Sequence, residues 1–283
     1  IRLKVRGTIN SYDIMLIRNK MINLKYLDLS EAEVKACSYE YYTGFCTHDN
    51  KLEDHSFSEL NLQVVHLPKN LEEIHRCFTD CQNLDTVYCQ LGLKQIGVSA
   101  CCNCPSLRYV GAHDGLKGIG DSAFYSTPNL ETVNLPSTLD SIGAYAFNMS
   151  GLKSVSIPAN VSYIGNEAFR YCKMESLSFP ANGKLHTISS EMFSNLSNLK
   201  TIDWENSSIT RIEYRGMANC DSLKISKFPK NLRYIGDYAF EYGYAIDTIN
   251  LPRRLETIGR GAFQYCNNTK VIKISSSVRE IQD

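Results

Sequence analysis

Two consecutive copies of one pattern occupy residues 128–172, and this repeat constrains the fold more than any other feature of the chain. The segment PNLETVNLPSTLDSIGAYAFNMS is followed by GLKSVSIPANVSYIGNEAFRYC. Leu130 corresponds to Leu152 and Phe147 to Phe169, so the period is 22 residues. Periods of this length are typical of repeat proteins, in which each unit buries its apolar side only by stacking on its neighbours. The chain is therefore expected to form a solenoid.

The pattern extends along most of the chain in steps of 22 to 25 residues. Its first apolar position is occupied by Leu62, Leu84, Leu107, Leu130, Leu152, Met174, Leu199, Leu223 and Ile246. The residues that follow alternate between apolar and polar, which predicts a short strand, and Ser226 is the one clear departure. A proline closes the strand in six units. Ile-Gly and Ala-Phe pairs then predict a turn at a glycine with positive φ and a short helical return.

These features predict an α/β repeat solenoid of roughly a dozen short parallel strands with short helical or irregular returns. A solenoid can be one domain of any length, so the 283 residues need not divide into two globular domains. Within such a stack the phenylalanines of the returns, most of which follow an alanine, are expected to be buried at equivalent places. They are Phe124, Phe147, Phe169, Phe193, Phe240 and Phe263.

The consensus L-x-x-V-x-L-P-x-x-L-x-x-I-G-x-x-A-F-x-x-C resembles the leucine-rich repeats of BspA-like surface proteins, known from Bacteroides and its relatives and from some protozoa. The resemblance covers about Leu24 to Ile281. It implies a right-handed leucine-rich-repeat coil in a secreted or surface-anchored protein that binds host proteins or other cells. It implies no shared catalytic residue.

Residues 1–23 are expected to form an N-terminal capping unit made of a strand and a helix. Leu3 lies 24 residues before Leu27, which marks the first residues as a strand of the same stack. Asn10 can cap a helix whose apolar residues recur at helical spacing from Ile14. The cap would shield the first repeat from solvent.

Residues 24–283 are expected to be repeats, with an open C-terminal end that marks a fragment or is covered by another surface. No apolar run is long enough for a membrane span or a signal peptide. We therefore expect no membrane insertion in this segment, and the location at the cell surface or in the medium is implied by the family resemblance alone.

An insertion of about 16 residues, roughly Glu33 to His48, interrupts the repeat and contains Tyr42 and Phe45. Insertions in solenoids project on one face, often the face that binds a partner. The alternative is that its aromatic side chains fold back onto the first strands.

Outward-facing strand residues are expected to form two columns along the exposed side of the sheet. Most are short polar residues, but aromatic residues gather near the N-terminal end, beside the insertion. Aromatic side chains on such a face are typical anchors for a ligand. The candidate ligand-binding residues are Tyr26, Asp28, Tyr42, Phe45, His66, Tyr88 and Tyr109. We expect the strand residues among them to form one patch, with the insertion rising from its rim.

Five cysteines, Cys81, Cys104, Cys172, Cys220 and Cys266, share one repeat position and are expected to be small, unpaired core residues. Cys37 and Cys46 both lie in the insertion, and whether they form a disulfide stays open. The cluster of cysteines at residues 101–104 is interpreted as core positions rather than a zinc site, because no second pair of ligands follows. No metal or cofactor is expected.

Lys and Arg together number 30, as do Asp and Glu, so the chain has no overall positive charge to attract nucleic acid or an anionic membrane. No catalytic motif is present, and an enzyme is not expected. The sequence favours a recognition or adhesion module that binds a protein or glycan on its strand face. The alternative is an architectural spacer in a larger surface protein.

Overall fold

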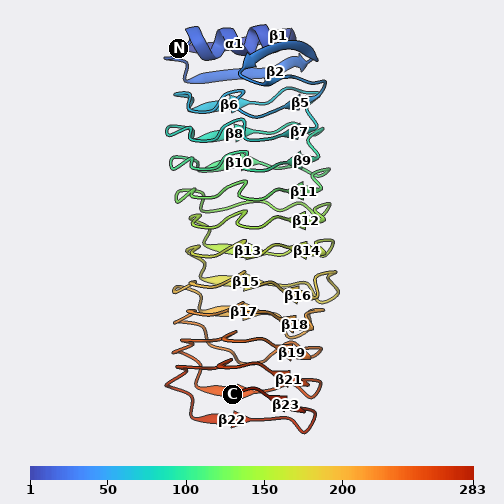
Figure 1. Ribbon diagram of the computed structural model, residues 1–283, viewed down its shortest axis with the longest axis vertical. Coiled ribbons are helices and arrows are strands. Elements are labelled where there is room, and N and C mark those ends of the chain that lie inside the picture. The colour runs from blue at the N-terminus through green and yellow to red at the C-terminus, as the bar shows by residue number, and fades with distance from the viewer. The chain divides into compact units, whose positions relative to one another are not determined.

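The computed structural model describes all 283 residues, which form two compact units, residues 1–139 and 140–283. In each unit the chain winds through successive coils, and short strands of successive coils lie side by side (Figure 1). The chain is a parallel-strand solenoid of about 12 turns with a single helix, which confirms the predicted fold class. The division into a cap of residues 1–23 and repeats over residues 24–283 stays a prediction.

The first unit contains a five-stranded parallel sheet in the order β1-β2-β6-β8-β10. Its strands are β1 (Arg2–Ile9), β2 (Tyr26–Val34), β6 (Val64–His66), β8 (Thr86–Tyr88) and β10 (Tyr109–Gly111). Partners across the sheet occupy the same repeat position, as with Val65, Val87 and Val110. A second sheet of the unit holds β5 (Lys51–Leu52), β7 (Glu73–Ile74), β9 (Gln95–Ile96) and β11 (Gly118–Ile119).

The second unit has the same two kinds of strand, but its first sheet is divided. One part contains β13 (Ser154–Ser156), β15 (Ser176–Ser178) and β17 (Thr201–Asp203), and the other contains β20 (Thr248–Asn250) and β22 (Val271–Lys273). The remaining strands are β12 (Ser141–Ile142), β14 (Tyr163–Ile164), β16 (Thr187–Ile188), β18 (Arg211–Ile212), β19 (Tyr234–Ile235), β21 (Thr257–Ile258) and β23 (Glu280–Ile281). The strand expected at residues 225–227 is absent, as is the one expected at residues 132–134 in the last coil of unit 1.

The Ile-Gly positions form the second strand of each coil, so the expected turn with positive φ at these glycines is wrong. Gly165 follows β14 and does not have positive φ. A Cβ atom there would lie 2.4 Å from the backbone nitrogen of Ala144 in the preceding coil. The glycine is therefore needed because neighbouring backbones approach closely.

The returns that contain the Ala-Phe pairs are irregular turns rather than helices. In the return around Phe169, Glu167 and Tyr171 have φ of 56° and 60°. The backbone N–H of Phe169 donates to the carbonyl of Met192 in the next coil, at 3.0 Å. Because these N–H groups bond to a neighbouring coil, they are not available for the i→i−4 bonds of a helix.

Phenylalanine rings stack along the returns and form the core beneath them. In the second unit, Phe169 lies 5.3 Å from Phe147 and 5.4 Å from Phe193 between ring centroids, with interplanar angles of 6° and 9°. Burial is confirmed for Phe124, Phe147, Phe169, Phe193 and Phe240. The expectation for Phe263 is wrong, because this ring lies in the last return of the unit and is only partly buried.

The five cysteines at the shared position bond to the preceding coil. Each S–H donates to the carbonyl of the return phenylalanine one coil earlier, as Cys172 does to Phe147 at 3.1 Å and Cys104 to Phe78 at 3.0 Å. The other pairs are Cys81 with Phe57, Cys220 with Phe193 and Cys266 with Phe240. Burial raises the pKa of Cys172 to about 12, so its thiol is protonated at neutral pH.

All eleven cysteines are free in the structure. The insertion forms a hairpin of β3 (Cys37–Tyr42) and β4 (Phe45–Thr47), in which Cys37 is opposite Thr47 rather than Cys46. Successive residues of a strand point to opposite faces, so this register directs Cys46 away from the face of Cys37.

Candidate ligand-binding surface

Four aromatic side chains on the first sheet of unit 1 form a continuous row, here called the aromatic ladder: Tyr26, His66, Tyr88 and Tyr109. The hydroxyl of Tyr26 lies 2.9 Å from Nε2 of His66. The imidazole of His66 stacks on Tyr88 with ring centroids 4.3 Å apart and planes at 21°. Tyr88 contacts Tyr109 at 5.8 Å between centroids. The structure thus brings four of the seven candidate residues together.

The register of the strands explains why these rings meet. His66 and Tyr88 are direct partners across β6 and β8, so their side chains lie in the same column. Tyr26 and Tyr109 lie in the adjacent column and reach their neighbours diagonally. Tyr109 leans over Gly111, where a Cβ atom would lie 3.3 Å from the tyrosine hydroxyl. Glycine at that position leaves the room that Tyr109 occupies.

The ladder is open to solvent at one end and covered at the other. Tyr88 and Tyr109 are 42% and 49% exposed, whereas Tyr26 and His66 are half-buried. The guanidinium of Arg2 lies 5.2 Å from the ring centroid of Tyr26. The result is a rigid row of rings with hydroxyl groups at its edges, suited to contact with an apolar protein side chain or the face of a sugar ring.

Asp28 lies beside the ladder but is occupied by its own chain. It is a direct partner of His66 in the sheet, is buried, and accepts hydrogen bonds from the backbone and hydroxyl of Ser30 at 3.0 and 2.6 Å. Lys4 forms an ion pair with it at 3.4 Å. Burial acts to raise the pKa of Asp28, but the bonds from Ser30 and the charge of Lys4 outweigh it and lower the pKa. Its position favours a structural role.

Tyr42 and Phe45 lie apart from the ladder, so the expectation that the insertion rises from the rim of the aromatic patch is wrong. Both rings pack against His55, at 4.8 and 5.3 Å between centroids. The guanidinium of Arg18 lies 5.0 Å from the centroid of Tyr42. Tyr42 and Phe45 of the insertion therefore contact the return segment of their coil.

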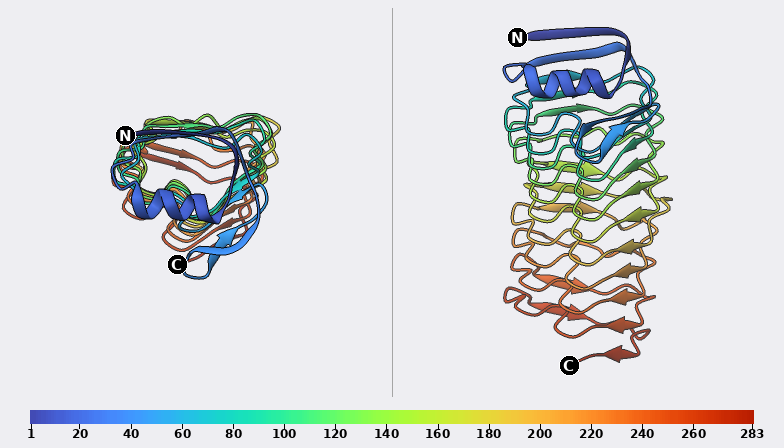
Figure 2. Two further views of the ribbon diagram at one scale, coloured as in Figure 1. Left: turned by 90° about the horizontal axis from the view of Figure 1, so that it is seen from above. Right: turned by 45° about the horizontal axis from the view of Figure 1, so that its top comes forward.

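The helix explains where the insertion docks. Helix α1 (Ser11–Lys20) begins with a capping box between Asn10 and Asp13. Tyr12 on this helix stacks on Tyr39 of the hairpin at 4.4 Å. Seen from above, α1 and the hairpin lie on one side of the unit and β1 lies on the other (Figure 2).

One feature of the second unit is not predicted by the repeat pattern. Positively charged side chains line two adjoining hollows, here called the basic groove: Lys227, Lys230, Arg233, Arg253, Arg254 and Arg279. The total charge of the chain is zero and therefore gives no indication of this cluster. The departure at Ser226 is the one sequence signal that marks its location.

No three His, Cys, Asp or Glu side chains are grouped so that they could hold a metal ion. No helix combines the length and apolar character needed to cross a membrane.

A family model described as the BspA type leucine-rich repeat region, in six copies, matches residues 50–175 and 162–283. No curated protein is similar in sequence to the chain. The match spans most of the repeats and agrees with the coils described above.

Several solved structures are similar to this chain. A leucine-rich repeat protein from Eubacterium ventriosum is 19% identical, with a TM-score of 0.60, over 92% of this chain and 72% of its own. A leucine-rich repeat protein from Bacteroides ovatus is 20% identical, with a TM-score of 0.42, over 88% and 89%. A leucine-rich cell surface protein from Faecalibacterium prausnitzii is 19% identical, with a TM-score of 0.36, over 99% and 90%. At such identities the likeness supports the fold alone. Only the TM-score of the Eubacterium ventriosum structure, 0.60, is high enough among these three to give that support.

Proposed function

Because the chain belongs to the family of proteins with the BspA-type leucine-rich repeat, we propose that it is a non-enzymatic recognition module, secreted or at the cell surface, which binds a protein or glycan through the aromatic ladder. Repeats of this kind are generally scaffolds for interaction, since stacked coils present a long regular surface. Membership of the family supports the role of an interaction module, and the aromatic ladder supports the proposal of this surface as the binding surface.

The observation that carries the proposal is the row of ring contacts in which His66 stacks on Tyr88 and meets Tyr26 on its other side, continued from Tyr88 to Tyr109. Rings held by their neighbours lose little side-chain entropy when a ligand binds. Exposed tyrosines also offer a large contact area together with a hydroxyl for orientation. The ladder is therefore better suited to binding than an isolated exposed ring.

The alternative function is a spacer within a larger surface protein. It is favoured by the first sheet of unit 2, where β13 and β15 expose Ser154, Ser156 and Ser176 and show no aromatic anchor. A spacer would bind no ligand on either sheet.

The test is a glycan-array and protein pull-down screen, followed by affinity measurement with the double variant Tyr88→Ala/Tyr109→Ala. Loss of both rings is expected to weaken binding by at least about 30-fold, which corresponds to ~2 kcal/mol. The matched control is Tyr145→Ala/Tyr163→Ala, which removes two exposed tyrosines of unit 2 and should leave the affinity unchanged. Because the chain is neutral overall, added salt should have little effect on this binding.

Equal affinity of the ladder variant and the native protein for every captured ligand would exclude the ladder as the binding surface. Failure to capture any ligand would support the spacer function.

A further inference from the structure

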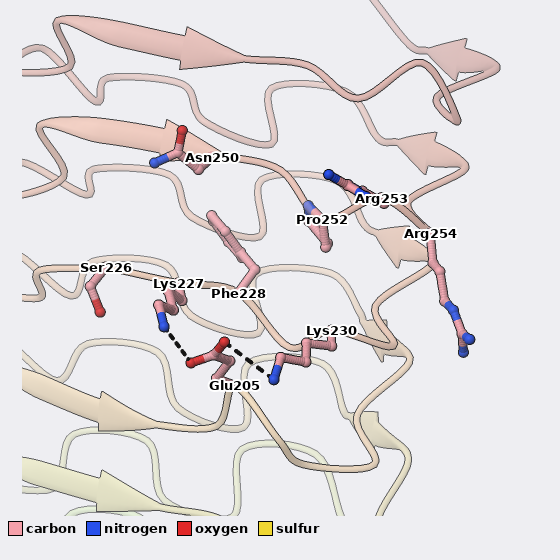
Figure 3. Close-up of a pocket in the computed structure, with 9 residues that line it drawn as sticks. All are labelled: Glu205, Ser226, Lys227, Phe228, Lys230, Asn250, Pro252, Arg253 and Arg254. Carbon is pink, nitrogen blue, oxygen red and sulfur yellow. Dashed lines mark hydrogen bonds and ion pairs between the residues drawn. The ribbon is translucent and has the colours of Figure 1, made fainter.

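The larger hollow of the basic groove lies where the first sheet of unit 2 is interrupted. It has a volume of about 490 Å³, and Figure 3 shows that its lining comes from three successive coils, those of Glu205, Phe228 and Pro252. Residues 224–227 lie between β17 and β20 but form no strand. The hollow is therefore a consequence of one irregular coil.

The sequence of that coil explains the interruption. Ser226 occupies a position that faces the core in the other coils, where a polar hydroxyl would lack a partner. The backbone is turned so that Ile225 is buried instead and both Ser226 and Lys227 are exposed. Two successive outward residues break the alternation that a strand requires.

The buried tryptophan of the preceding coil holds this arrangement in place. The indole N–H of Trp204 donates to the carbonyl of Lys227 at 2.7 Å. This carbonyl thus points toward the core rather than along the sheet. Phe228 follows and is buried against Trp204 at 6.1 Å between centroids.

Charge in the larger hollow is only partly balanced. Glu205 accepts from Lys227 at 2.9 Å and pairs with Lys230 at 3.5 Å, so one carboxylate faces two lysines (Figure 3). Arg254 donates to the side chain of Asn231 at 2.9 Å, which leaves its charge unpaired. Arg253 forms no ion pair and no side-chain hydrogen bond.

The second hollow continues the positive surface. It has a volume of about 480 Å³, shares Arg253 and Arg254 with the first, and adds Arg233, Arg279 and Glu256. Arg233 pairs with Glu256 at 2.6 Å. Six cations therefore face two carboxylates along the basic groove, in a chain whose total charge is zero.

We propose that the basic groove binds an acidic polysaccharide, a sugar chain that carries carboxylate or sulfate groups. The cations come from successive coils, whose neighbouring strands lie about 4.8 Å apart, so they match a row of anionic groups better than a single compact phosphate. Such a chain would place its acidic groups against Arg253, Arg254 and Lys230.

The other lining groups favour a sugar over other anionic polymers. Ser226, Asn250, Ser276 and Ser277 can bond to hydroxyl groups, and Pro252 offers an apolar surface for the face of a sugar ring. The only aromatic ring in the lining, Phe228, is buried, so no exposed ring is available to stack on nucleic-acid bases. An acidic peptide would need pockets for apolar anchors, which this lining lacks.

The test is direct binding of the whole chain to four probes at low salt: polygalacturonate, which carries carboxylates, dextran sulfate, which carries sulfates, neutral dextran, and poly-glutamate. At least one acidic polysaccharide should bind, with an affinity that falls as salt is added, and dextran should not. Comparison of the first two probes identifies the acidic group. Binding of dextran at equal affinity, or tighter binding of poly-glutamate than of either polysaccharide, would overturn the assignment.

Two variants locate the site. Arg253→Gln/Arg254→Gln should weaken binding at least about tenfold, because two charge-assisted hydrogen bonds are lost. The matched control Lys184→Gln/Lys200→Gln removes the same charge from exposed positions of the same unit and should change the affinity less than about twofold. Glu205→Gln should tighten binding, since it frees Lys227 and Lys230. Equal weakening by the control pair would mean that the polysaccharide responds to total charge, and the groove would not be its site.

Discussion

The first sheet of unit 1 runs without a break from β1 to β10 and ends before the coil of residues 132–134, which forms no strand, whereas in unit 2 the sheet is divided between β17 and β20. Where every coil keeps its alternation, outward side chains form straight columns, and the rings of the aromatic ladder touch because the register aligns them. Where one coil loses it, a hollow lined by charged side chains appears. A regular solenoid thus presents a surface of aligned side chains, and a single irregular coil adds a recess.

The returns, by contrast, are built alike in the two units. Rings stack in both, as Phe57 on Phe78 and Phe169 on Phe193 show. Cysteines donate to the preceding phenylalanine carbonyl in both as well. The difference between the units is therefore confined to the strand side of the coil.

The largest effect on stability is expected from truncation of a return phenylalanine, and the comparison of one such variant in each unit tests whether the two return cores are equivalent. Phe78→Ala in unit 1 and Phe169→Ala in unit 2 should each lower the free energy of unfolding by ~3–5 kcal/mol, because both rings are fully buried and their removal leaves a cavity. Chemical denaturation followed by circular dichroism would measure both. Phe263→Ala is the control and should cost clearly less, since this ring is partly exposed. A large difference between Phe78→Ala and Phe169→Ala would show that the two return cores are not alike.

A loss of stability of intermediate size is expected at alkaline pH. Burial raises the pKa of Cys172 to about 12 and also raises that of Cys104. The folded state thus keeps protons that the unfolded thiols lose above pH ~8.5, so stability is full below that pH and falls as pH rises toward 12. Each buried thiol should contribute a loss of ~1.4 kcal/mol per pH unit within this window.

Denaturation curves between pH 8 and 11 for the native protein and the variants Cys104→Ala and Cys172→Ala would measure this contribution. Both variants should show a shallower decline of stability with pH than the native chain. Rapid labelling of Cys104 or Cys172 in the native protein by a cysteine reagent at pH 8, located by peptide mass spectrometry, would argue against their burial.

The double variant Ile225→Thr/Ser226→Val is expected to change stability the least. It tests most directly why the first sheet is interrupted in unit 2 and not between β1 and β10. This pair of changes restores the outward–inward alternation, so residues 225–227 should join β17 and β20 in one sheet. We expect the free energy of unfolding to change by less than ~1.5 kcal/mol, because one buried aliphatic side chain replaces another. Amide hydrogen exchange at residues 225–227 should slow.

The same variant should lose most of its affinity for the acidic polysaccharide, since the rebuilt strand fills the hollow. The single variant Ser226→Ala is the control, because it keeps Ile225 in the core and leaves the alternation broken. If the double variant kept both fast amide exchange at residues 225–227 and full affinity for the polysaccharide, the loss of alternation at Ser226 would not be the cause of the interrupted sheet.

Much of this protein follows from its sequence. The period of 22 to 25 residues places Val65, Val87 and Val110 in one row, and the outward columns, the stacked phenylalanines and the shared cysteine position follow from the same spacing. Four of the seven candidate residues meet for this reason. Each of these features depends on neighbours one period apart, and that separation can be counted along the chain.

Other features were decided by the tertiary structure. The hairpin docks on α1 through Tyr12 and Tyr39, and the irregular coil turns toward Trp204. The Ile-Gly positions form a second sheet because neighbouring backbones approach closely at Gly165. Apolar spacing identifies which residues face inward, but it does not specify where an insertion packs or how a broken strand rotates. Those outcomes depend on the shape of surfaces and on hydrogen bonds between residues that no repeat relates.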